Sequence, residues 1–101
     1  MELSSEDVRV ISESLELFAV RNPDLPLAAS AAHSLALSIL SGKSELTSDE
    51  LDAVISTLRC YRDELDEQLD MSEYDRTEVL TTKKAVNAVL RKIRKTLQAQ
   101  P

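Results

Sequence analysis

Two side chains, His33 and Cys60, are the first candidates for chemistry, because the chain contains one histidine and one cysteine. A catalytic triad or a zinc site needs its histidine close to a nucleophile or to further ligands. The sequence neighbours of His33 are alanine, serine and leucine, and the only cation beside Cys60 is Arg59. We therefore expect an ordinary helix histidine and a surface or interface thiol, with no catalytic residue and no enzyme activity.

An acidic run, Asp63 to Asp70, is the next candidate, because carboxylates bind divalent cations. The run has neither the central glycine nor the alternating oxygen ligands of an EF-hand loop, so a solvated acidic face is expected. Gly42 is the only glycine, which leaves no glycine-rich loop for a phosphate. We predict no metal site and no cofactor.

The composition indicates which elements position these side chains. Only one glycine and three prolines are present, whereas hydrophobic residues make up 43% and charged residues 30% of the chain. These values are typical of a folded domain and favour a few long helices over many strands. With 101 residues, one domain spanning 1–101 is expected. A single cysteine, and a first segment with no basic or long apolar stretch, predict a cytoplasmic protein.

Apolar residues at helical spacing predict four helices, and their limits follow from capping signals. Ser4 with Asp7 and Thr47 with Glu50 are spaced as N-terminal caps, while Pro23 and Gly42 interrupt the apolar pattern. The expected helices span about 4–21, 26–41, 47–70 and 72–97.

The last two expected helices are joined by a short link at Met71, so they must form an antiparallel hairpin. Counting outward from the link places apolar residues opposite each other, for example Leu58 opposite Val86. The expected fold is all-α and four-helix bundle-like, with the two shorter helices packed on this long hairpin.

Charge is divided unevenly along the chain, although the net charge is −6. Residues 1–75 carry 17 acidic and 5 basic side chains, whereas residues 76–101 carry 7 basic and 1 acidic. Lys84, Arg91 and Lys95 fall opposite the apolar side of the last helix and form its candidate basic face. This face either pairs with acidic residues of the preceding helix and with solvent, or binds an acidic partner.

The segment Leu25 to Gly42 contains no Asp, Glu, Lys or Arg, and a helix of this kind is usually buried on most sides. The first two helices also show apolar residues off their main stripes. These residues form the candidate interface, which is Val10, Leu17, Leu37 and Leu40. Because one protomer of this size is not expected to cover both strips, they predict a homodimer or a groove for a protein partner.

The sequence therefore favours a protein–protein interaction module, a self-associating adaptor or regulator whose partner is not identified. The alternative is a nucleic-acid-associated regulator that uses Lys84, Arg91 and Lys95. A net charge of −6 and the lack of aromatic residues among these basic side chains disfavour the alternative. Binding to a membrane is not expected, because the uncharged segment is barely long enough and contains serines and a histidine.

Overall fold

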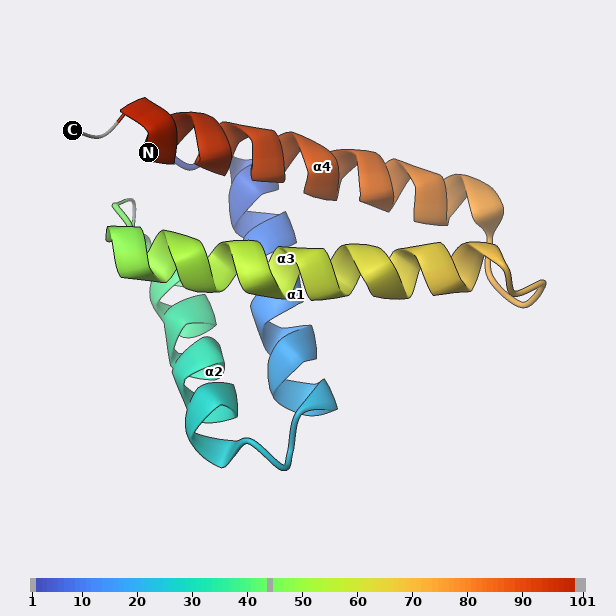
Figure 1. Cartoon of the computed structure of the whole chain (residues 1–101), viewed down its shortest axis with the longest axis horizontal. Helices are drawn as coiled ribbons and strands as arrows, with labels where there is room; N and C mark the ends of the chain where they lie inside the picture. Colours follow the sequence, from blue (N-terminus) through green and yellow to red (C-terminus); the bar gives the residue numbers. More distant parts are fainter. Residues whose placement is uncertain (1, 44, 100–101) are drawn as a thin grey trace.

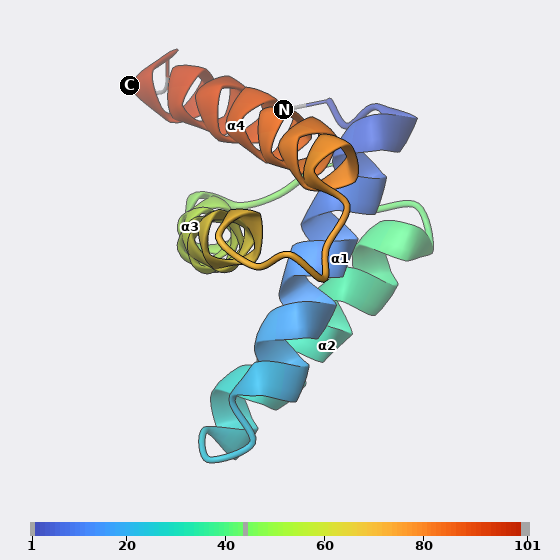
Figure 2. The same ribbon diagram turned by 90° about the vertical axis from the view of Figure 1, so that its right-hand side faces the viewer.

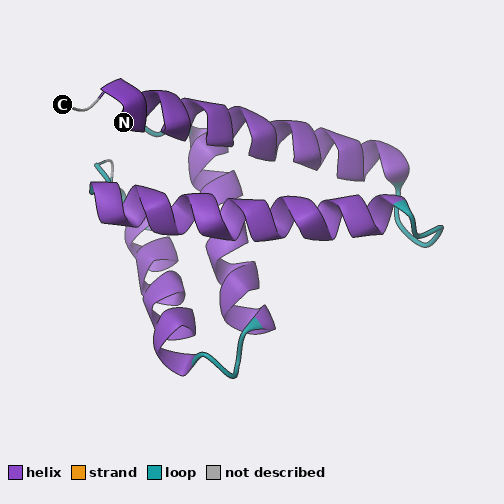
Figure 3. Ribbon diagram, viewed as in Figure 1, coloured by secondary structure: helices purple, strands orange, loops and turns teal. Residues whose placement is uncertain are grey.

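A computed structural model of the chain describes residues 2–43 and 45–99, and these ranges contain four helices and no strand (Figures 1 and 3). The expectation of an all-helical fold is confirmed. Met1, Ser44, Gln100 and Pro101, which belong to the expected domain, lie outside the described residues. The helices are α1 (Ser5–Arg21), α2 (Pro26–Leu40), α3 (Ser48–Leu69) and α4 (Arg76–Ala99).

Two capping boxes begin α1 and α3, as the sequence signals indicate. The Ser4 hydroxyl accepts the amide of Asp7 at 3.1 Å, and the Asp7 carboxylate accepts the amide of Ser4 at 3.0 Å. Thr47 and Glu50 repeat the arrangement at 3.2 and 2.9 Å. Each box satisfies amides that the first turn of a helix leaves without a backbone partner.

The link between α3 and α4 is longer than expected, because α4 begins at Arg76 rather than near residue 72. The Asp75 carboxylate accepts the amides of Thr77 at 2.9 Å and Glu78 at 3.3 Å. Asp75 thus satisfies the first amides of α4 and fixes its start, although Ser72 offers a similar side chain earlier in the chain.

The four helices form two hairpins that cross each other. The α3–α4 hairpin is antiparallel, and α1 and α2 run across it (Figures 1 and 2). α1 lies close to all three other helices, whereas the backbone of α2 lies close to α1 alone and makes no close contact with the backbone of α3 or α4. The expected four-helix bundle-like arrangement, with the two shorter helices packed on the long hairpin, is therefore not confirmed.

The hydrophobic core lies where α1 meets the α3–α4 hairpin. It combines residues of all four helices with Leu46, which precedes α3. The largest fully buried aliphatic side chains are Ile11, Leu15, Ile39, Leu51, Leu58, Leu90 and Ile93. Since α1 supplies the shared surface, its position decides which sides of α2 and α3 stay open.

Buried hydroxyls mark the crossing of α1 and α3. The Ser14 Oγ and Thr57 Oγ1 atoms lie 3.4 Å apart, and both residues are buried. Each hydroxyl also donates to a carbonyl of its own helix, Ser14 to Ile11 at 2.8 Å and Thr57 to Val54 at 2.9 Å. These two small side chains let the helix backbones approach closely with their polar atoms satisfied.

Candidate functional site

An apolar groove opens between α2 and α3, with α1 as its floor. Leu15 and Phe18 of α1 lie at the bottom, and the groove encloses about 480 Å³. The remaining lining residues are Ala28, Ala31, Ala32 and Leu35 of α2 and Asp49, Glu50, Ala53, Ser56 and Thr57 of α3. α1 lies close to both α2 and α3, whereas the backbones of α2 and α3 make no close contact, so the groove lies between two helices that share α1 as a neighbour. Figure 1 shows α1 and α2 running across α3.

α2 is much more exposed than its sequence suggests. Only Ala32, Ala36 and Ile39 are buried, although no residue between Leu25 and Gly42 carries a charge. The expectation that this helix is buried on most sides is wrong for the single chain, because α2 has only α1 as a neighbour. An uncharged helix that lies largely in solvent is the least usual feature of the described structure.

The four candidate interface residues do not lie on one surface. Val10 is 1% exposed and belongs to the core, so its assignment to an interface is corrected. The reason is that α1 packs on several sides, which places Val10 inside the protomer. Leu37 and Leu40 of α2 are 50% and 58% exposed and remain open to a partner.

Leu17 lies in a second hollow, away from Leu37 and Leu40. This hollow encloses about 370 Å³ between the end of α1 and the outer half of the α3–α4 hairpin. Tyr61 lines it, and burial together with the nearby Glu13 carboxylate raises the pKa of this phenol. Arg21 forms an ion pair with Glu64 at its edge, so the hollow is more polar than the groove.

The groove carries charge only on its α3 side, at Asp49 and Glu50. Lys43 donates to the Glu50 carboxylate at 2.7 Å. This bond and the amide of Thr47 lower the pKa of Glu50. The charge of Glu50 is thus balanced within the protomer, whereas Asp49 is exposed, and the lining residues of α1 and α2 are uncharged.

The basic residues of α4 divide into two sets. Lys83 pairs with Asp66 of α3, and Lys92 pairs with Asp7 of α1. Lys84, Arg91 and Lys95 are exposed and, among the described residues, take part in no ion pair. The candidate basic face is therefore free, whereas basic residues at its flanks hold α4 against α3 and α1.

The residues considered for chemistry are not assembled into a cluster. His33 lies on the exposed side of α2, with its Nδ1 atom 2.7 Å from a carboxylate oxygen of Glu16 on α1. Cys60 is exposed on α3, beside the hollows that contain Arg21 and Glu64. Across residues 2–43 and 45–99, no three His, Cys, Asp or Glu side chains converge as metal ligands.

Comparison with known proteins adds no relative. No protein-family model matches this chain, and no curated protein or solved structure matches it.

A separate observation concerns membranes. Within the part of the chain that the structure describes, no helix has both the length and the apolar run that a membrane crossing requires.

The groove is the feature that the sequence did not reveal. Ala28, Ala31 and Leu35 follow one side of the second helix, which was expected to be buried on most sides, yet Ala28 and Ala31 are exposed. The only sequence signal was the missing charge from Leu25 to Gly42. The missing charge indicates that this helix is covered by other protein surface. It does not indicate whether that surface belongs to the same chain or to another one.

Proposed function

We propose that this chain is a small cytoplasmic protein–protein interaction module, an adaptor or regulator that self-associates through α2 and carries out no reaction of its own. The observation that carries the proposal is the exposure of α2, a helix without a single charged residue. Exposing the apolar side chains of an uncharged helix to water is unfavourable, and such exposed surfaces usually bind another protein.

The two open sides of α2 support an adaptor role. One side faces the groove through Ala28, Ala31 and Leu35, and the other presents Leu37 and Leu40. A helix that is open on two sides has room for a second copy on one of them and a different protein on the other. Leu37 and Leu40 thus stay in the proposed binding surface, and Val10 does not.

The test is the oligomeric state of the full chain and its dependence on α2. Sedimentation velocity from about 1 to 100 µM should show association, in the range where weak protein pairs form. The double variant Ala31→Glu with Leu37→Lys places a charge on each open side of α2 and should be monomeric, with an unchanged far-UV circular dichroism spectrum. The matched double variant Lys84→Glu with Arg91→Glu should associate as the wild type does.

A nucleic-acid-associated regulator is the alternative function, and the exposed, unpaired Lys84, Arg91 and Lys95 favour it. Phosphate contacts would give retention on heparin or DNA that falls steeply with salt. Changing these three residues to Glu should then abolish the retention. Absence of salt-dependent retention, or retention that survives the triple change, rules the alternative out.

A further inference from the structure

We infer that the groove between α2 and α3 receives the α2 helix of a second copy of this chain, so that two copies pair about a two-fold axis beside α2. This inference rests on the proposed function, because it names the partner and the side of α2 that the partner covers.

One edge of α2 serves as both a wall of the groove and a ridge that fits into it. Leu27, Ala31 and Leu35 are spaced four residues apart and follow this edge. Ala31 and Leu35 line the groove, and Leu27, one turn earlier, is 88% exposed. A two-fold axis along this edge places the ridge of each copy in the groove of the other, which is the self-complementary contact of symmetric dimers.

Charge selects α2 as the occupant. The floor and the α2 wall of the groove carry no charge. On the α3 wall, Glu50 is already paired with Lys43, and the other charged residue, Asp49, is exposed. A helix that brought Lys, Arg, Asp or Glu against the floor or the α2 wall would bury charges without partners there, which is strongly unfavourable. Of the four helices, α2 is the one with no charged residue to bury.

The open surface of the protomer matches what one pairing would cover. Its accessible area is 6400 Å², whereas a folded monomer of 11.2 kDa exposes about 5700 Å² by the usual scaling with mass. The excess of about 700 Å² is close to the roughly 800 Å² that each partner buries in a standard interface. The excess accessible area of the protomer is thus about the area that a second copy would cover.

The first test compares two neighbouring positions of α2 in the full chain. Ala31→Glu places a carboxylate on the groove side, and Ser30→Glu places the same group on the side of Leu37. Both positions are exposed in the protomer, so both variants should keep the far-UV circular dichroism of the wild type. Sedimentation velocity should show association weakened at least about tenfold by Ala31→Glu, since it buries an unpaired charge. Ser30→Glu should leave the association within about twofold.

The second test detects the proposed contact between α2 of one copy and the groove of the other by disulfide formation. In a Cys60→Ser background, Leu27→Cys protein is mixed with Ala53→Cys protein under mild oxidation. A disulfide between the two different chains is expected, because residue 27 of one copy lies in the groove beside residue 53 of the other. Leu37→Cys mixed with Ala53→Cys is the control and should give no mixed disulfide.

The outcomes separate this inference from the proposed function. Association that survives Ala31→Glu but is lost in Ser30→Glu and Leu37→Lys keeps self-association and overturns the assignment of the groove. A wild-type chain that stays monomeric at tens of micromolar overturns both self-association and the inference. Loss of association in Ala31→Glu alone, together with the 27–53 disulfide, supports both.

Discussion

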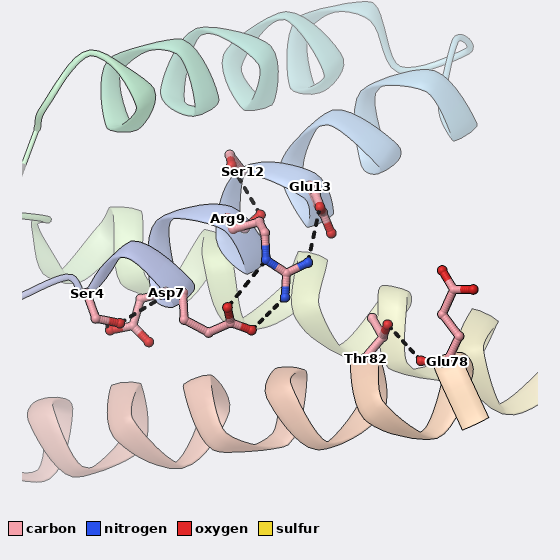
Figure 4. Close-up of polar contacts among 8 residues, drawn as sticks. Ser4, Asp7, Arg9, Ser12, Glu13, Glu78 and Thr82 are labelled. Atoms are coloured by element: carbon pink, nitrogen blue, oxygen red, sulfur yellow. Dashed lines mark hydrogen bonds and ion pairs between the residues drawn. The ribbon is translucent and has the colours of Figure 1, made fainter. Parts of the chain in front are cut away.

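Lys92 of α4 forms an ion pair with Asp7, the same carboxylate that completes the capping box at the start of α1. The Asp7 side chain is 10% exposed, and burial by itself raises its pKa. Hydrogen bonds from Lys92 and Ser4 outweigh the burial, so the pKa of Asp7 lies below its usual value. One carboxylate therefore starts α1 and joins it to α4. Figure 4 shows Ser4 and Asp7 at the start of α1 and the nearby Arg9–Glu13 ion pair.

Asp7→Asn should lower the free energy of unfolding by about 1–3 kcal/mol at neutral pH, because Lys92 then loses its partner. A carboxylate whose pKa is lower in the folded state stabilises the protein above its unfolded-state pKa of about 3.9, and this contribution is lost as the pH falls through the folded value. Urea denaturation should show the difference from wild type shrinking between pH 6 and pH 3.

Glu6→Gln is the matched control for Asp7→Asn. Glu6 also pairs with a cation, but this pair is exposed to solvent. Its loss should change the stability by at most about 0.5 kcal/mol. A destabilisation by Asp7→Asn that is the same at pH 3 and pH 6 would show that the charge of Asp7 contributes nothing.

Val10 and Leu40 have similar side chains but opposite environments, at 1% and 58% exposure. Val10→Ala removes two buried methyl groups and should cost about 2 kcal/mol in the free energy of unfolding. Leu40→Ala should change that free energy by no more than about 0.5 kcal/mol. Thermal unfolding monitored by circular dichroism measures both, and an equal effect of the two substitutions would contradict the position of α1 at the centre of the fold.

Thr47 begins α3 through its side chain, so Thr47→Ala should lower the stability by about 1 kcal/mol. For a domain of this size the midpoint of thermal unfolding should fall by about 4–8 °C. Thr47→Ser keeps a hydroxyl at the cap and should restore most of the loss. Failure of the serine variant to do so would assign the effect to the methyl group instead of the cap.

Substitutions at Ser14, which contacts Thr57, test how closely α1 and α3 pack. Ser14→Ala should cost less than about 1 kcal/mol, because Thr57 still donates to the Val54 carbonyl when the serine hydroxyl is removed. Ser14→Leu adds volume where the helices cross and should cost about 1–3 kcal/mol or more. Denaturant titration gives both values, and tolerance of leucine would indicate a looser crossing.

The local parts of the fold could be predicted from the sequence. The capping residues Ser4 and Thr47 act within their own first turns, so short-range spacing is enough to predict them. The start of α4 was predicted too early, because Ser72 and Asp75 are similar capping residues and only Asp75 is used.

The crossing of the hairpins could not be predicted in this way. Helical periodicity shows which sides of a helix are apolar, but it does not say which neighbour covers each side. Val10 was therefore assigned to a surplus strip, while α1 uses that strip inside the protomer. Ala31 shows the reverse error, since it belongs to a helix that was expected to be buried on most sides and lies at the open groove.

Among the described helices, α1 is also the only one whose backbone lies close to α2. We therefore expect α2 to unfold separately from the rest of the protein. Its release exposes Ala32, Ala36 and Ile39 but leaves the contact between α3 and α4 in place. Native-state amide exchange should reveal α2 as a unit that opens before the rest. Loss of α1, in contrast, removes the helix that packs against all three others, so its amides should exchange only when the whole chain unfolds.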